Sequence, residues 1–356
     1  MKTVLFHHPD LGNNKIFTPN SSGRDRYGLD PFIYLKEKLH SLGYKLMTSD
    51  DNPLTDCVWV IFLNSPSSKF IRPNGIKNKL KSIKSSLFGK RSKEKPRDLY
   101  RECVDSGFKN ISIILWDNDA ICPGNFSKIL HEKFPIIFTW NDSYIDNKKF
   151  FKFYHPIARE LPEVPKIPFK EKKMLVNISR NRYSSDPNEL YSARRKSIIY
   201  FEKNFPNDFD LYGYGWNKPA GRLQNLFPFL VHKFSSYRGS IESKAEVLSQ
   251  YKFSLAYENL EGENGYISEK IFDCFRCNTV PIYWGAPNVE EFIDPETFID
   301  RSKFKSDKEL ADFIIKINEK KYNQYLAAIN AYLKSEKYKL FSAENFADTI
   351  IRVLNL

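Results

Sequence analysis

Hydrophobic residues in the first half of the chain fall into short runs, and one segment between two of these runs has helical spacing. Five runs have the length of a buried strand: 3–7, 44–47, 57–63, 111–116 and 136–140. The segment from Pro31 to Leu42 carries apolar residues on one helical face and is followed by Gly43, which is typical of a helix end. Strands that alternate with helices predict an α/β fold with a parallel, doubly wound sheet.

The alternation is repeated in the second half of the chain. Predicted strands lie at 174–178, 209–212, 253–257 and 280–284. Predicted helices lie at 192–204, 242–250, 268–276 and in the tail from Ser306. Proline and lysine are concentrated between the two halves, as in a linker. The predicted organisation is a first domain at 1–161, a linker at 162–173, a second domain at 174–340, and a final helix in 341–356 that packs back on the first domain.

Two such units predict two Rossmann-like domains that face each other across a cleft. In open parallel sheets, ligands bind beyond the carboxyl ends of the strands, so side chains that directly follow a strand are the first candidates for a functional site. The composition, 41% hydrophobic and 28% charged, is that of a folded globular protein and excludes a disordered or collagen-like chain.

The formal net charge of +12 favours an anionic partner such as a nucleotide, a nucleic acid or an anionic membrane. Most of the excess lies in a predicted insert at about 69–97, which has eleven basic residues and one acidic residue. Within it, helical spacing relates Ile76, Leu80, Ile83 and Leu87. A basic amphipathic helix lies in the plane of an anionic membrane, so we expect peripheral contact through 72–95. The alternative is that this stripe packs on the first domain.

The five cysteines are sparse and odd in number, which favours a reducing compartment over a disulfide framework. Cys274 and Cys277 form a CxxC, but no second ligand pair with zinc spacing accompanies it, so we expect a helical face. The sequence shows neither a signal-peptide core at its start nor an apolar run of 18 residues. These features predict a cytoplasmic protein, peripheral at the inner membrane face.

A polar, glycine-containing segment follows the predicted strand that ends at Tyr257. It leads into a predicted helix that begins near Ser268, a suitable N-cap, and Glu269 suits the positive end of the helix dipole. A helix N-terminus with Lys270 beside it is also suited to receive a diphosphate.

The region from Tyr251 to Asp300 resembles the signature of the α-1,3/4-fucosyltransferases, glycosyltransferase family 10. The matching motifs are KFSLAYEN, YISEK and TVPIYWG, and agreement is looser over roughly 110–250. The resemblance implies a GT-B fold of two Rossmann-like domains and GDP-fucose binding in the second domain. It implies inverting transfer of fucose to a hydroxyl of a GlcNAc or glucose unit in a surface glycan, through an α-1,3 or α-1,4 linkage. The acceptor is an oligosaccharide or a glycolipid.

The resemblance also implies roles for individual residues. Glu269 would hydrogen-bond the ribose or fucose side of the donor, Lys270 would face the diphosphate, and Asn259 and Tyr266 would line the nucleotide pocket. The family's arginine before a helix corresponds to Arg195, with Arg194 one position away. Because Arg195 and Lys270 would both neutralise the leaving diphosphate, we expect no required cofactor, and a divalent metal would be at most stimulatory.

Inverting transfer needs a carboxylate that takes the proton of the acceptor hydroxyl. Asp117 follows the strand 111–116 and is the predicted base, with Asp119 in reserve; family members usually carry glutamate at the position of Asp117. His7 and His8 follow the first strand and are expected on the acceptor side.

Two alternatives remain open from the sequence. Asp117-Asn118-Asp119 also spells the D-x-D of metal-dependent GT-A glycosyltransferases. The basic composition also suits a nucleic-acid-binding protein, although no recognition module stands out and we expect no nucleic-acid partner.

Overall fold

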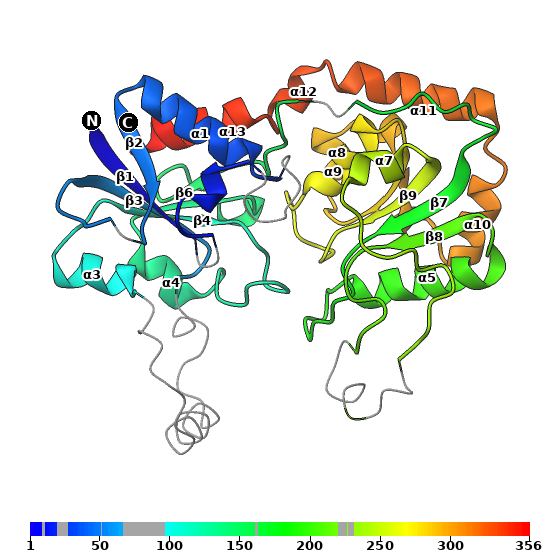
Figure 1. The fold of residues 1–356 in the computed structure, drawn as a ribbon, viewed down its shortest axis with the longest axis horizontal. Coiled ribbons are helices and arrows are strands. Elements are labelled where there is room, and N and C mark those ends of the chain that lie inside the picture. Colours follow the sequence, from blue (N-terminus) through cyan, green and yellow to red (C-terminus); the bar gives the residue numbers. More distant parts are fainter. Residues whose placement is uncertain are drawn as a thin grey trace.

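The computed structural model describes residues 1–8, 11–19, 28–50, 52–66, 97–160, 163–219, 226 and 231–356. Two α/β domains lie beside each other, each built around its own sheet, and the amino and carboxyl termini both lie in the first domain (Figure 1). The predicted membrane segment at 72–95, with nearly all of the basic insert, lies outside the described residues.

The first domain contains a six-stranded sheet in the order β2-β1-β3-β4-β5-β6, in which all neighbouring strands are parallel. The strands are β1 (Lys2–His7), β2 (Tyr44–Thr48), β3 (Cys57–Leu63), β4 (Ile111–Leu115), β5 (Ile136–Thr139) and β6 (Phe150–Lys152). Its helices include α1 (Asp30–Ser41), α3 (Leu99–Asp105) and α4 (Lys128–Lys133), with 3-10 turns at Lys15–Phe17 and Asp142–Tyr144. The helices α3 and α4 cover the face opposite to α1 (Figure 1).

The second domain contains a five-stranded parallel sheet in the order β11-β10-β9-β7-β8. The strands are β7 (Lys173–Ile178), β8 (Phe209–Tyr212), β9 (Tyr251–Tyr257), β10 (Val280–Trp284) and β11 (Ile299–Asp300). The helices are α5 (Tyr191–Asn204), α7 (Lys244–Leu248), α8 (Glu269–Arg276), α9 (Val289–Phe292), α10 (Asp307–Ile314), α11 (Glu319–Tyr332) and α12 (Glu336–Lys339), with 3-10 turns at Pro295–Thr297 and Arg301–Lys303. Strand β9 is buried almost throughout and β7 is buried at its centre, as expected of central strands with helices on both faces.

The chain returns to the first domain at its end. The helices α11 and α12 lead back toward that domain, and α13 (Ala343–Leu354) lies beside α1 (Figure 1). Phe346 and Ile350 of α13 belong to the same buried cluster as Phe32 and Leu35 of α1. The last helix therefore completes the core of the first domain and ties the two domains together.

The predicted fold of two parallel-sheet α/β domains is confirmed, and the strands 57–63, 209–212 and 280–284 have the predicted bounds. The part of the chain that the structure describes contains no helix long and apolar enough to span a membrane.

Candidate active site

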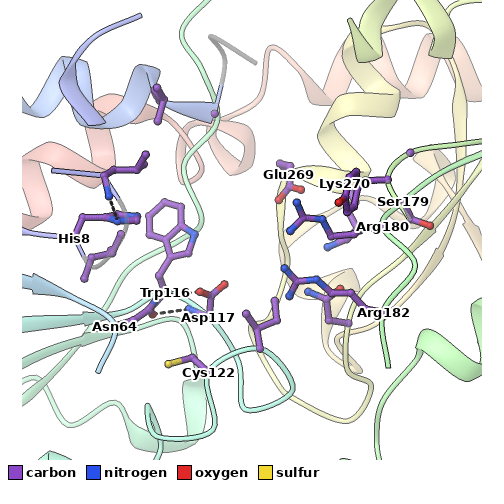
Figure 2. Close-up of a pocket in the computed structure, with 18 of the residues that line it drawn as sticks. His8, Asn64, Trp116, Asp117, Cys122, Ser179, Arg180, Arg182, Glu269 and Lys270 are labelled. Atoms are coloured by element: carbon purple, nitrogen blue, oxygen red, sulfur yellow. Dashed lines mark hydrogen bonds between the residues drawn. The ribbon is translucent and has the colours of Figure 1, made fainter. Parts of the chain in front are cut away.

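A cavity of about 770 Å³ lies between the two domains, at the carboxyl ends of both sheets. Figure 2 shows side chains of the first domain facing side chains of the second across this cavity. The labelled residues of the first domain are His8, Asn64, Trp116, Asp117 and Cys122, and those of the second are Ser179, Arg180, Arg182, Glu269 and Lys270. The site thus lies where the Rossmann-like architecture predicts it.

Asn64 positions the predicted base on the first-domain side. It directly follows β3 with φ of 62°, a left-handed conformation that asparagine tolerates better than most residues. Its Nδ2 donates to Oδ2 of Asp117 at 2.8 Å, and its Oδ1 accepts from the Asp117 backbone N–H at 2.9 Å. Asn125, which is fully buried, donates in turn to Oδ1 of Asn64 at 2.8 Å. The Asp117 carboxylate is therefore held at the cavity wall by a side chain from the neighbouring strand.

The second-domain wall is strongly cationic. Among the described residues, five basic side chains line it: Arg180, Arg182, Arg194, Lys244 and Lys270. The first two follow β7, and the guanidinium of Arg180 lies 5.2 Å from the ring centre of Tyr214, which also lines the cavity. A wall of fixed cations is suited to a ligand with several negative charges, such as a diphosphate.

The start of α8 is built around a buried carboxylate, Glu258. Its Oε1 accepts from the backbone N–H of Ser268 at 2.8 Å, and its Oε2 accepts from Nζ of Lys270 at 2.7 Å. Lys270 also donates to Oγ of Ser268 at 2.9 Å. This network places the Lys270 ammonium group at the cavity edge, and the sequence motif gave no indication that Glu258 was its anchor.

Glu269 is the first residue of α8 and points into the cavity (Figure 2). About half of its side chain is exposed, at 52%. The surrounding cleft opposes its ionisation by partial desolvation, but the positive charges of Lys270 and Lys244 outweigh that effect and lower the pKa of the Glu269 carboxyl. Glu269 therefore stays ionised and can accept hydrogen bonds from hydroxyl groups of a ligand.

Asn259 and Tyr266, both predicted to line the nucleotide pocket, differ in their position relative to the cavity. Asn259 lines the cavity and donates to the hydroxyl oxygen of Tyr266 at 3.3 Å. Tyr266 is 3% exposed and does not line the cavity. It packs against Trp140 of the first domain, with ring centres 4.6 Å apart. Tyr266 supports the wall from behind.

Arg195 does not line the cavity, whereas Arg194 does. The guanidinium of Arg195 lies 3.6 Å from the ring centre of Tyr183, and its Nη1 donates to the carbonyl oxygen of Arg182 at 3.0 Å. Arg194 is 4% exposed and donates to the carbonyl oxygens of Tyr257 and Glu258 at 2.6 and 2.9 Å. Because adjacent helical residues point in different directions, one residue of register decides which arginine lines the cavity.

Of the remaining predicted residues, His8 lines this cavity, whereas His7 and Asp119 do not. His8 lines the cavity, and its Nδ1 accepts from the Leu11 backbone N–H at 3.0 Å. His7 does not line it; its Nδ1 lies 2.9 Å from Oγ of Ser49, and burial lowers the pKa of the His7 imidazole. Asp119 lines a second, neighbouring cavity rather than the one that holds Asp117.

The described residues include no group of three or more His, Cys, Asp or Glu side chains arranged to hold a metal ion. The CxxC lies at the end of α8, with Cys274 in the helix and Cys277 at its C-cap. Both cysteines are buried, and burial raises the pKa of both thiols. The helical-face interpretation of this motif agrees with their burial.

Three comparisons with known proteins bear on this geometry. A model described as "Glycosyltransferase family 10 (fucosyltransferase) C-term" matches residues 170–348. An α-(1,3)-fucosyltransferase of Helicobacter pylori is 31% identical over 173 residues, covering 42% of this chain and 36% of the relative. An α-(1,4)-fucosyltransferase of Arabidopsis thaliana is 43% identical over 82 residues, covering 22% of this chain and 20% of the relative. The alignments thus span about a third or less of the length of these curated relatives.

A crystal structure of an α1,3-fucosyltransferase with GDP matches all of this chain and 90% of that one, with a TM-score of 0.53 and 14% identity. That likeness, with the two facing parallel sheets, defines the fold as GT-B. The family model covers half of the chain, and the chain therefore belongs to glycosyltransferase family 10. The GT-A alternative is wrong: the fold is GT-B, and the two aspartates of the D-x-D line different cavities.

Proposed function

We propose that this protein is an inverting fucosyltransferase that moves L-fucose from GDP-fucose to a hydroxyl of a GlcNAc or glucose unit, through an α-1,3 or α-1,4 linkage. One observation carries the proposal: a single cavity places the Asp117 carboxylate on one domain and five basic side chains on the other. Transfer to a hydroxyl requires a base on the acceptor side and positive charge on the donor side, and this cavity provides both.

The basic wall defines the donor side. Departure of GDP leaves negative charge on its β-phosphate, and fixed cations stabilise that charge where it develops. Arg180, Arg182 and Lys270 are the side chains proposed to contact the diphosphate. Lys270 remains partly exposed beside its partner Glu258, whereas Arg194 is buried and donates to two carbonyl oxygens. Since these groups supply the charge that a metal would otherwise supply, we propose that a divalent metal is not required and at most stimulates transfer.

The first domain provides the acceptor side. Asp117 takes the proton of the acceptor hydroxyl while that oxygen attacks C1 of fucose, and the bond from C1 to the GDP oxygen breaks. The hydrogen bond from Asn64 orients the Asp117 carboxylate at the cavity wall, where it faces the substrate. Glu269, held ionised across the cavity, accepts hydrogen bonds from hydroxyl groups of the fucose or the ribose.

The direct test incubates the full chain with GDP-fucose and a panel of type 1 and type 2 disaccharides. We expect GDP release that depends on the disaccharide and persists in excess EDTA. Complete loss of transfer in EDTA, restored by Mn²⁺, would contradict the metal-independent account.

We further propose, from the sequence pattern of 72–95, that the enzyme acts at an anionic inner membrane surface on acceptors of a surface glycan, such as a lipopolysaccharide or a glycoprotein. Each basic residue near such a surface contributes about 1 kcal/mol. Co-sedimentation with anionic vesicles at low salt should be lost when 72–95 is deleted, and equal sedimentation of both proteins would end the proposal. If the deletion variant remains active on a soluble disaccharide, residues 72–95 serve membrane contact. If it loses that activity, they serve acceptor binding.

A further inference from the structure

A second cavity, of about 290 Å³, lies beside the active site and is also formed by both domains. Its volume is near the lower end of ligand pockets, which span roughly 300–1,000 Å³. Three carboxylates line it: Asp119 from the first domain, and Asp186 and Glu263 from the second. Aromatic rings line it as well, contributed by Phe126, Trp140 and Tyr144.

The two cavities share one stretch of chain. Asp117 faces the active-site cavity, whereas the next two residues, Asn118 and Asp119, line the second cavity. The same alternation occurs on the other domain, where Asn259 lines the first cavity and Leu260 the second. A ligand longer than one sugar that presents a hydroxyl to Asp117 would therefore place its neighbouring unit at the second cavity.

The walls of the second cavity are fixed by contacts between the domains. Nδ2 of Asn141 donates to Oε2 of Glu263 at 2.7 Å. Beside it, the backbone N–H of Asp142 donates to the carbonyl oxygen of Asn264 at 3.2 Å. The cavity therefore has its shape before a ligand enters, which lowers the entropic cost of binding.

Two buried polar side chains at this cavity lack partners among the described residues. Asn118 is 0% exposed, and both its Oδ1 and its Nδ2 make no hydrogen bond within the part of the chain that the structure describes. The indole N–H of Trp140, which is 1% exposed, is likewise unpaired there. Buried amides almost always have partners, so two donors and an acceptor left open at one cavity indicate a polar ligand.

The negative charge of the cavity lining favours a cationic ligand. No lysine or arginine is among the described residues that line it. Burial and the negative charges of Asp186 and Glu263 raise the pKa of Asp119, and burial and Asp186 raise the pKa of Glu263. A neutral ligand would leave this repulsion in place, whereas a cationic group would relieve it.

We propose that the second cavity is an acceptor subsite that binds a hexosamine unit with a free, protonated amino group, next to the unit that receives fucose. The proposal rests on the proposed fucosyl transfer. The ammonium group meets Asp119, Asp186 and Glu263, ring hydroxyls pair with Asn118 and the Trp140 N–H, and the apolar sugar face lies on an aromatic ring. A metal ion fits less well, because the described carboxylates do not form a group that could hold one.

The test compares two probes that differ only at the amine, methyl β-glucosaminide and its N-acetyl counterpart. Their dissociation constants for the full chain are measured by ligand-observed NMR at pH 6.5 with GDP present. We expect the free amine to bind at least about tenfold more tightly, since charge-assisted hydrogen bonds are roughly twice as strong as neutral ones. Asp119→Asn and Glu263→Gln should each bring the ratio close to one, while Glu261→Gln, on the same loop as Glu263 but outside the cavity, should preserve it.

Equal affinity of the two probes in the wild type, or a ratio that survives in both variants, would overturn the proposal. Tighter binding of N-acetyl-lysine methylamide than of the glucosaminide would overturn it too, because the site would then be one for a peptide. GDP affinity, measured by calorimetry on the same samples, tests the proposed function separately. The ratio of the dissociation constants of the two sugar probes tests the subsite, whether or not GDP binds.

Discussion

Nζ of Lys270 lies 2.7 Å from Oε2 of Glu258, a carboxylate that is fully buried just after β9. The lysine remains partly open to the cavity, with 24% of its side chain exposed. The pair therefore joins the core of the second domain to the donor side of the cavity.

Glu258→Gln should lower the free energy of unfolding by about 3–5 kcal/mol, because it leaves Lys270 without its buried counter-charge. Urea denaturation followed by circular dichroism measures the change. Glu290→Gln is the matched control, since Glu290 pairs with Lys303 at 2.9 Å on the surface and should contribute little. A similar decrease in the free energy of unfolding in both variants would show that the buried pair stabilises the protein no more than the surface pair does.

Donor binding should depend on Arg180 and Arg182 as well as on Lys270. Each alanine variant should weaken GDP binding by about tenfold or more, the effect of losing one charge-assisted contact to phosphate. Arg195→Ala should weaken GDP binding less, because Arg195 only supports the backbone at Arg182. Isothermal calorimetry compares the four variants, and unchanged affinity in Arg180→Ala, Arg182→Ala and Lys270→Ala would refute the assigned donor wall.

Variants of the proposed base should lose turnover without losing GDP affinity. Asp117→Asn should leave GDP affinity unchanged and reduce turnover by about 10²-fold or more, since a positioned base contributes on that scale. Asn64→Ala should lower turnover through a misplaced Asp117, with the same GDP affinity. If Asp119→Asn lost turnover on a neutral acceptor while Asp117→Asn kept it, the base would be Asp119.

Stability should fall in acid partly because of His155. This side chain is buried among aromatic rings, including Trp116 and Phe153, and burial lowers the pKa of its imidazole from 6.5 to about 3. Between these two values the unfolded chain binds a proton that the folded chain does not, so folding stability decreases as the pH falls.

The slope contributed by one such group is about 1.4 kcal/mol per pH unit. His155→Phe should flatten the decline of unfolding free energy between about pH 6 and 4, whereas His40→Gln, at an exposed site, should leave it unchanged. Part of the slope should remain, since burial also lowers the pKa of His7 and His131. Parallel pH profiles for wild type and His155→Phe would contradict this account.

The sequence predicted the central strands well because their hydrophobic runs are long and continuous. It did not predict β6 and β11, which have only three and two residues and no pattern of their own. The short helices α3 and α4 were also missed, because seven and six residues provide too few turns for a clear periodicity.

Sequence reasoning pointed to three residues that line the cavity: Asp117, which follows a strand, and Glu269 and Lys270 at the start of a helix. Their roles in transfer stay predictions. Arg180 and Arg182 were missed, although they too follow a strand, β7, because the irregular segment after it has no motif. Arg195 does not line the cavity and Arg194 does, because the hydrogen bonds of Arg194 to the carbonyl oxygens of Tyr257 and Glu258 fix how the helix is turned, which the sequence does not show. Contacts between domains, such as Asn141 with Glu263, span 122 residues and leave no local signal.

One cavity is proposed to combine an acceptor base on the first domain with a GDP-binding wall on the second. Product analysis with GDP-fucose and the responsive disaccharide, comparing wild type with Asp117→Asn, tests it most directly. We expect NMR to show an α-linked fucoside and equimolar GDP from the wild type. Asp117→Asn should bind GDP normally but form product about 10²-fold more slowly. A β-linked product, or normal turnover in Asp117→Asn, would contradict it.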